Sequence, residues 1–224
     1  CGSTNAELLT RATSGAPSGT VVVAERQTAG RGRMGREWIA APGDSLTFSL
    51  LRRFAEGNEL SGLSLAAGVA VARALEKLGA GGTALKWPND VLKDGRKLAG
   101  ILIELQSNTA AVIGIGLNLR LPAAMPNEVR ATAAALDVEV DPNLLLAALL
   151  TELLTVLDAF AVAGFATVRD EWLARHAWAG RPVRVLMPHA APLDGICAGI
   201  ADDGALLLET AAGVRRILSG DVSL

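Results

Sequence analysis

The segment 27–38, QTAGRGRMGREW, carries three arginines and three glycines directly after the apolar run Val21–Ala24. Such an apolar run predicts a buried strand, so the arginine-glycine segment is predicted to be a loop at the end of that strand. Arginine offers a planar set of permanent N–H donors, and glycine lets the backbone approach a ligand closely. A solvated basic turn has the same composition. An anion-binding loop is favoured over that alternative because a second motif follows.

The second motif is Lys86-Trp87-Pro88-Asn89-Asp90, followed by the segment 93–104, KDGRKLAGILIE. Asp94-Gly95 lies between apolar runs and is typical of a tight hairpin turn, since both residues tolerate a positive φ. The pattern predicts that Lys86 and Lys97 lie on neighbouring strands.

Four segments in this order resemble the biotin protein ligases: Ser3-Thr4-Asn5, the segment 27–38, the segment 86–104, and 114–118, GIGLN. The resemblance covers nearly the whole chain and corresponds to the form without an N-terminal DNA-binding domain. It implies an α+β fold, with a mixed, mostly antiparallel sheet covered by helices as in class II synthetases and biotin and lipoate ligases. It also implies a catalytic domain over residues 1–178 and a small SH3-like β-barrel over residues 179–224.

Local patterns predict the elements of this fold. Thr4-x-x-Glu7 resembles a capping box and predicts a helix start at Thr4. Asp141-Pro142 is a typical cap and first turn of another helix, and Leu193-Asp194-Gly195 is typical of a turn. Helices are predicted over 4–12, 60–78, 144–160 and 165–176, and strands over 20–25, 45–51, 83–87, 91–93, 97–106, 110–119, 183–187, 196–200, 205–209 and 214–218.

Composition excludes several classes of protein. The net charge of −2 lacks the positive field of a dedicated nucleic-acid binder. Cys1 and Cys197 are too few for a disulfide framework or a zinc site, which indicates the reducing cytoplasm. No uninterrupted apolar run reaches the ~20 residues of a membrane helix, and no export leader is recognised. A soluble, cytoplasmic protein without a membrane partner is predicted.

The resemblance implies a two-step reaction. Biotin attacks the α-phosphate of ATP to give biotinyl-5′-AMP, and a lysine of a biotin carboxyl carrier protein then attacks this adenylate. Both steps develop negative charge, so preorganised cations are the main catalytic requirement. By resemblance, the catalytic residues are Arg33, Lys86 and Lys97. Biotin would contact Ser3, Thr4, Asn5, Gln27, Gly30, Arg31, Gly32, Arg33, Lys97 and Gly100; ATP or the adenylate would contact Arg33, Arg36, Lys86, Trp87, Asn89 and Asn118; and Asp90 would bind Mg²⁺.

Each assignment has a structural alternative. Thr4 is either a helix cap or a contact of the ureido ring, or both. Arg36 serves the ATP phosphates or forms a surface ion pair with Glu37 or another acid. Lys97 is otherwise an exposed strand lysine, Asp90 an Asx turn, and Asn118 a core amide.

The aromatic residues and histidines receive structural assignments. Trp38 is predicted to belong to the core, although it or Trp87 could also form a pocket wall. His176 and His189 lack any neighbouring ligand pattern and are predicted to have structural roles.

Rival functions share parts of these motifs. A lipoate–protein ligase uses the same adenylate chemistry, and a nucleotide-binding scaffold would bind ATP without turnover. A DNA-binding repressor is disfavoured because the chain starts almost at the first motif, and a P-loop NTPase because G-x-x-x-x-G-K-[ST] is absent. The oligomeric state is left open, and a homodimer is compatible with the sequence.

Overall fold

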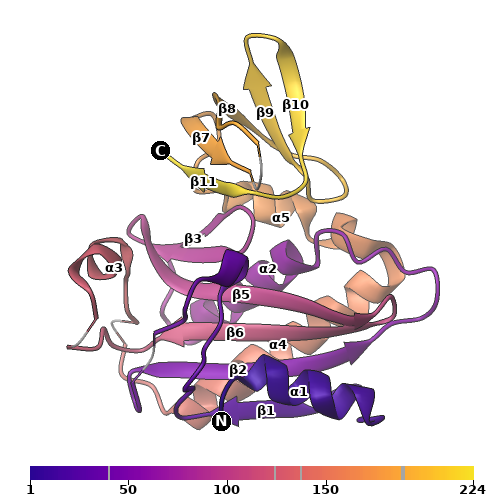
Figure 1. The fold of residues 1–224 in the computed structure, drawn as a ribbon, viewed down its shortest axis with the longest axis vertical. Coiled ribbons are helices and arrows are strands. Elements are labelled where there is room, and N and C mark those ends of the chain that lie inside the picture. Colours follow the sequence, from indigo (N-terminus) through magenta and orange to yellow (C-terminus); the bar gives the residue numbers. More distant parts are fainter. Residues whose placement is uncertain (40, 124, 137, 188–189) are drawn as a thin grey trace.

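The computed structural model describes residues 1–39, 41–123, 125–136, 138–187 and 190–224. It contains a six-stranded sheet flanked by helices and a five-stranded sheet stacked at one end (Figure 1). The helices and 3-10 turns are α1 (Thr4–Thr13), η1 (Arg33–Gly35), α2 (Leu63–Lys77), α3 (Asn127–Thr132), α4 (Pro142–Ala163), η2 (Gly164–Thr167) and α5 (Arg169–Ala174). The strands are β1 (Val21–Ala24), β2 (Ser45–Arg53), β3 (Thr83–Lys86), β4 (Asp90–Lys93), β5 (Arg96–Ser107), β6 (Ala110–Asn118), β7 (Pro182–Leu186), β8 (Leu193–Ile200), β9 (Leu206–Thr210), β10 (Gly213–Ile217) and β11 (Asp221–Ser223).

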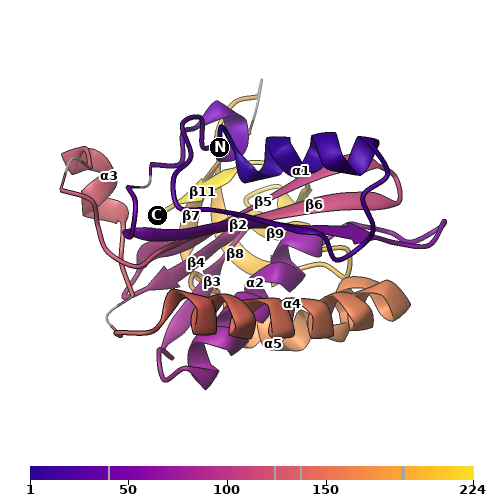
Figure 2. The ribbon, with the colours of Figure 1, turned by 90° about the horizontal axis from the view of Figure 1, so that it is seen from below.

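The large sheet has the order β1-β2-β6-β5-β4-β3, and each neighbouring pair is antiparallel. Helix α1 covers one face, while α2, α4 and α5 lie on the other (Figure 2). Strand β2 shows the resulting pattern of burial. Phe48 and Leu50 point into the main core with α2 and α4, whereas Leu51 packs in the smaller cluster under α1. Alternation of side chains across a strand places Ser49 on the α1 face as well.

Helix α1 begins at Thr4, and its N-cap lies one residue earlier than predicted. Ser3 has extended backbone dihedrals, and its side chain accepts a hydrogen bond from the amide of Ala6, so Ser3 is the N-cap. The prediction that Thr4 caps the helix is therefore wrong. As the first helical residue, Thr4 has its hydroxyl available for other partners.

The Asp94-Gly95 turn joins β4 to β5, with Asp94 at a φ of 51° and Gly95 at 73°. The hairpin prediction is confirmed, but Lys86 and Lys97 do not lie on neighbouring strands. Lys86 ends β3 and Lys97 lies on β5, so β4 separates them. Asp90, the first residue of β4, lies between the two lysines.

Two other local predictions differ from the structure. The predicted helix 165–176 is divided into η2 and α5, and the predicted turn at Leu193-Asp194-Gly195 is the start of strand β8. Helix α3 and strand β11 were not predicted. Helix α3 has six residues and no side-chain cap, and strand β11 has three residues. Both are too short to show a long apolar repeat in the sequence.

The C-terminal strands form an antiparallel sheet in the order β10-β9-β8-β7-β11. The predicted α+β class is confirmed, and the short strands suit an SH3-like module, although no pairing joins β10 to β11 among the described strands. The indole of Trp87 donates to the carbonyl of Gly204 at 3.0 Å, which ties the KWPND segment to this sheet. The domain boundary after residue 178 stays a prediction; it falls between α5 and β7.

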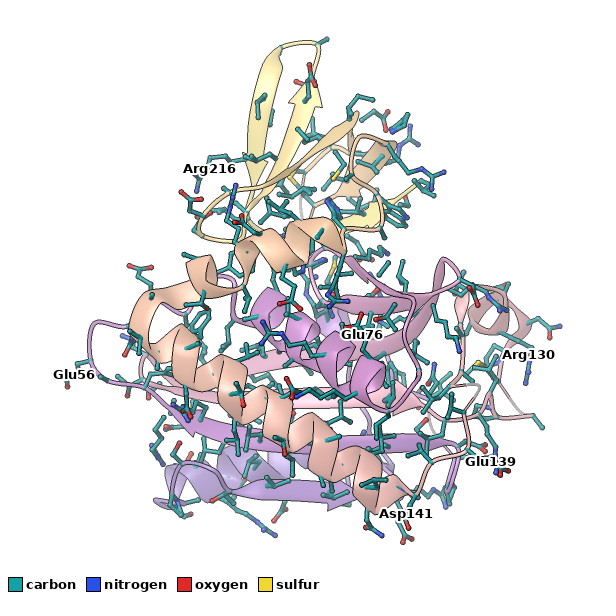
Figure 3. The ribbon with its side chains drawn as sticks, turned by 180° about the vertical axis from the view of Figure 1, so that it is seen from behind. Glu56, Glu76, Arg130, Glu139, Asp141 and Arg216 are labelled. Carbon is teal, nitrogen blue, oxygen red and sulfur yellow. The ribbon has the colours of Figure 1, made fainter. Side chains whose placement is uncertain are left out.

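Helix α4 crosses the back of the large sheet (Figure 3). The stretch Pro142–Thr167 is long and apolar enough to cross a membrane by length and composition alone, and a core helix passes the same test. Asp141 caps α4 as predicted, through the amides of Asn143 and Leu144. Helix α4 packs against α2 and buries Leu145, Leu149, Leu153 and Leu157, which is the arrangement of a core helix.

Candidate active site

A cavity of about 360 Å³ lies on the α1 face of the large sheet, between the N-terminal residues, the arginine-glycine loop and strands β5 and β6. Its floor on the sheet is formed by Gly100, Gly114 and Gly116. A Cβ on Gly116 would overlap the indole of Trp38, and one on Gly114 would overlap the amide of Asn5. The glycines therefore let other side chains lie directly on the sheet and keep the cavity deep.

One end of the cavity is lined by neutral polar groups. Thr4 donates its backbone N–H to Oε1 of Gln27 at 2.7 Å, and the Thr4 hydroxyl lies 3.2 Å from the same oxygen. Ser49, which is fully buried on β2, lies 2.8 Å from Thr4 Oγ1 and 2.5 Å from Asn5 Oδ1. Because these groups carry no net charge, this end suits an uncharged polar ring.

The arginine-glycine loop spans the cavity mouth. Gly32 donates its amide to the carbonyl of Arg36 at 2.7 Å, and η1 reverses the chain between them. Arg33 donates to Oδ1 of Asn89 and to the carbonyl of Gly220, each at 3.3 Å. Burial lowers the pKa of Arg33, and nearby Asp90 opposes this shift. The loop thus bridges the large sheet and the C-terminal sheet.

Arg36 forms an ion pair with Asp221, the first residue of β11. An ion pair was one of the two predicted alternatives for Arg36, with Glu37 or another acid as the partner. Asp221 also lines the cavity, so the C-terminal sheet contributes a residue to its wall. No signal in the sequence linked residues 36 and 221, which meet only after both units have folded.

The ammonium groups of Lys86 and Lys97 both lie close to the carboxylate of Asp90. Lys97 Nζ lies 2.6 Å from Asp90 Oδ1 and 5.8 Å from the centroid of the Trp38 ring. Lys86 Nζ lies 3.9 Å from Asp90 Oδ2 and 4.8 Å from the centroid of the Trp178 ring. Burial lowers the pKa of Lys86, and the Asp90 carboxylate opposes this shift. Lys97 reaches the cavity, whereas Lys86 lies behind Asp90.

The surroundings of Asp90 fit a magnesium ion poorly. Two ammonium groups already neutralise its carboxylate, and no cluster of three metal-ligating side chains occurs in the described part of the chain. Mg²⁺ favours one or two carboxylates together with phosphates and water. Direct coordination by Asp90 would require the ion to displace Lys97. The predicted Asx turn is not what Asp90 forms either.

A further wall of the cavity comes from α3 and its flanks. It combines the apolar side chains of Met125, Val129 and Ala133 with the polar ones of Glu128 and Thr132. The buried amide of Asn118 donates to the carbonyl of Ala134 at 3.0 Å and holds this segment against β6. Asn118 therefore has the packing role that was its alternative, while also lining the cavity.

The cavity gathers most of the residues predicted for the site, from the four segments 3–5, 27–38, 86–104 and 114–118. Those in its lining are Ser3, Thr4, Asn5, Gln27, Arg31, Gly32, Arg33, Arg36, Asn89, Asp90, Lys97, Gly100 and Asn118. Among described residues, Gly30, Lys86 and Trp87 fall outside that lining. Gly30 belongs to the outer side of the loop, where a Cβ would meet the carbonyl of Trp38 at 2.6 Å.

The structural roles predicted for Trp38 and His176 have different outcomes. Trp38 is only partly buried and lines the cavity, so its assignment to the core is wrong. The ring of His176 packs against Trp172 at a tilt of 45°, with ring centroids 4.6 Å apart, and burial lowers the pKa of His176 to about 4, which agrees with a structural role. His189 lies outside the described residues.

Gly114 and Gly116 lie two residues apart on one strand and line the cavity. This spacing of glycines was the sequence signal that could have predicted the cavity floor.

The sequence matches the biotin/lipoate A/B protein ligase family over residues 3–119 and the biotin protein ligase C-terminal domain over residues 179–224. The chain therefore belongs to the biotin/lipoate A/B protein ligase family. The C-terminal match places it among the biotin protein ligases of that family.

Similar proteins agree with this assignment. Biotin–[acetyl-CoA-carboxylase] ligase of Mycobacterium tuberculosis is 40% identical over 231 residues, covering 99% of this chain and 85% of that protein. The bifunctional ligase/repressor BirA of Escherichia coli is 37% identical, covering 92% of this chain but 67% of its own length. Biotin protein ligase from Aquifex aeolicus, solved in complex with biotin and ATP, superposes with a TM-score of 0.86 at 32% identity, covering 99% and 94% of the two chains.

Proposed function

We propose that this chain activates biotin with ATP and transfers it to one lysine of the biotin carboxyl carrier protein of acetyl-CoA carboxylase or a related carboxylase. In the first step a biotin carboxylate oxygen attacks the α-phosphorus of ATP, and pyrophosphate leaves. In the second step the neutral amine of the acceptor lysine attacks the acyl carbon of biotinyl-5′-AMP. AMP leaves with the bonding electron pair, and the proton that the nitrogen loses passes to water.

The observation that carries the proposal is one cavity with a neutral polar end and a cationic middle. Thr4 and Gln27 line the first part, and Lys97, Arg31 and Arg33 line the second. A carboxylate and a phosphate repel one another, so fixed cations between them lower the cost of bringing them together. Lys97 would hold the carboxylate during attack, and Arg33 the phosphate of the adenylate.

The loop around Arg33 also supports the protection of an adenylate. Its guanidinium contacts Asn89 on one side and Gly220 on the other, so the loop covers the cavity mouth. Exclusion of water by such a cover slows hydrolysis of a mixed anhydride. Arg36 would exchange Asp221 for the ATP phosphates, because both partners are anions.

Magnesium would enter with ATP rather than through Asp90. The phosphate oxygens and water supply the hard ligands that Mg²⁺ favours, and Asp90 stays paired with Lys97. Lys86 would then act through Asp90, as a second ammonium that holds this carboxylate in place. We expect the reaction to take place in the cytoplasm, in accord with the free thiols of Cys1 and Cys197.

Exchange of labelled pyrophosphate into ATP, measured with and without biotin, tests the first step. We expect exchange only when biotin is present, followed by labelling of a carrier domain when one is added. Exchange driven by lipoate and not by biotin would identify a lipoate ligase instead. ATP binding without any exchange would identify a non-catalytic nucleotide-binding protein.

A further inference from the structure

The amide of Asn5 has an orientation that its neighbours determine. Its Nδ2 group donates to the carbonyl of Leu102 at 3.3 Å and to Oε2 of Glu104 at 2.8 Å. Both oxygens are acceptors only, because neither carries a proton when the carboxylate is ionised. Nδ2 must therefore face β5, and Oδ1 must face Ser49 on the other side. Asn5 is 3% exposed and has no room to turn, since its amide lies on Gly114.

This orientation determines where the proton of Ser49 points. Asn5 Oδ1 carries no hydrogen, so the 2.5 Å bond between them requires Ser49 to donate. A hydroxyl has one proton, and Ser49 can then only accept from its other neighbour, the hydroxyl of Thr4 at 2.8 Å. The Thr4 hydroxyl lies within reach of two acceptors, Ser49 Oγ at 2.8 Å and Oε1 of Gln27 at 3.2 Å. We assign its proton to Ser49, because that contact is shorter and Oε1 of Gln27 already accepts from the Thr4 amide.

The chain of bonds therefore gives the cavity a defined pattern of donor and acceptor. The Thr4 hydroxyl, with its proton committed to Ser49, presents a lone pair. Gln27, with its oxygen committed to the Thr4 amide, presents its Nε2 group. An acceptor beside a donor complements a ring in which an N–H adjoins a carbonyl, as in a cyclic urea.

We propose that Glu104 is a positioning residue that sets the direction of this hydrogen-bond chain and thereby the selectivity of the cavity for a ring N–H. The inference rests on the proposed function and deepens it. Glu104 itself stays outside the cavity lining. The same carboxylate oxygen accepts from Arg31 at 3.2 Å, so the residue also contacts the arginine-glycine loop.

Three substitutions separate these roles. Glu104→Gln keeps an oxygen that accepts from Asn5 but removes the charge facing Arg31. Glu104→Met keeps the length of the side chain and removes the acceptor. Glu104→Lys presents donors only, which favours a reversed amide of Asn5 and a Thr4 proton directed away from Ser49. Glu56→Met is the matched control, because Glu56 is an exposed carboxylate on the loop after β2, at the opposite edge of the molecule from Arg130 (Figure 3).

The measurement is the affinity for biotin and for a biotin analogue methylated on its ureido nitrogens, by titration calorimetry, alongside thermal unfolding. We expect the wild type, Glu104→Gln and Glu56→Met to favour biotin by about tenfold or more, the usual scale of one hydrogen-bond mismatch. For Glu104→Met and Glu104→Lys we expect that ratio to fall at least about fivefold, through weaker biotin binding. The biotin KM of exchange should rise while kcat at saturating biotin stays within about threefold, since a positioning role acts on binding.

Every outcome bears on the proposal. If Glu104→Gln loses selectivity as fully as Glu104→Met, the charge facing Arg31 is responsible and the inference is wrong. If neither Glu104→Met nor Glu104→Lys changes the ratio, the chain does not depend on Glu104 and the inference is again wrong. Should one of these two variants fail to fold, the other decides. Absence of biotin binding by the wild type would instead refute the proposed function.

Discussion

Replacement of Lys97 by methionine is the most direct test of the proposed chemistry. Its ammonium lies in the cavity, 2.6 Å from Asp90, and methionine keeps the length of the side chain without the charge. Removing the charge leaves the biotin carboxylate to approach ATP against uncompensated repulsion. Lys86 stays 3.9 Å from Asp90, so this carboxylate keeps one cationic neighbour and the fold should be retained.

The expected magnitude follows from the charges. An ammonium and a carboxylate at about 4 Å interact by about 4 kcal/mol at an effective dielectric constant of about 20. The carboxylate of Asp90 already partly neutralises the ammonium of Lys97. We therefore take about half of the interaction energy with the biotin carboxylate, about 2 kcal/mol, as lost in the variant. Since each 1.36 kcal/mol is tenfold in rate, kcat/KM for biotin should fall about 30-fold, with about 1000-fold as the upper limit.

The assay is biotin-dependent exchange of pyrophosphate into ATP, with thermal unfolding to check the fold. Arg96→Met is the matched control. Arg96 is the exposed neighbour of Lys97 on β5, and successive side chains of a strand point to opposite faces. We expect Arg96→Met to exchange at the wild-type rate. Exchange by a folded Lys97→Met variant within about threefold of wild type would refute the assignment of Lys97.

Three further outcomes are expected. Arg33→Ala should release biotinyl-AMP faster than wild type in a filtration assay, because the loop loses its contacts to Asn89 and Gly220; unchanged release would remove Arg33 from that role. Gly114→Ala should lower the free energy of unfolding by about 1–3 kcal/mol and weaken biotin binding, since the new methyl group overlaps the amide of Asn5; wild-type affinity by calorimetry would contradict this. Burial lowers the pKa of His176 from 6.5 to about 4, so the unfolded chain binds the proton more readily and stability is lost as pH falls from 6.5 towards 4. Urea unfolding of wild type should therefore lose up to about 2 kcal/mol more between pH 7 and 5 than that of His176→Gln, and parallel losses would exclude this titration.

The motifs alone predicted the cationic loop and the strand that carries Lys97. Arginine and glycine in QTAGRGRMGREW predict an anion-binding loop through their own chemistry, and Asp94-Gly95 determines a hairpin through its backbone dihedrals. The period-two alternation of Leu46, Phe48 and Leu50 with polar or small residues likewise predicted the strand over 45–51, and in the structure these three side chains lie in the core. These are local properties, which depend on a few consecutive residues.

Assignments that depended on distant contacts were less successful from sequence. Trp38 was predicted to be core because large aromatic residues usually are, yet Gly116 leaves room for its indole at the cavity. Lys86 shared a motif with Asp90 and was predicted to face ATP, yet β4 inserts between it and Lys97 and it lies behind Asp90. In both cases, the position of a side chain was determined by what another strand placed beside it.

The sequence by itself determined the family, the fold class and the chemical character of the loop, because these follow from residue types at fixed local spacing. Only the tertiary structure decided that Asp221 meets Arg36, that α3 forms a wall of the cavity, and that Glu104 orients the amide of Asn5. The contact of Asn5 with Glu104 joins residues 99 positions apart, and that of Arg36 with Asp221 joins residues 185 positions apart. A hydrogen bond or ion pair over such a separation depends on strand order and helix packing, which no local pattern specifies.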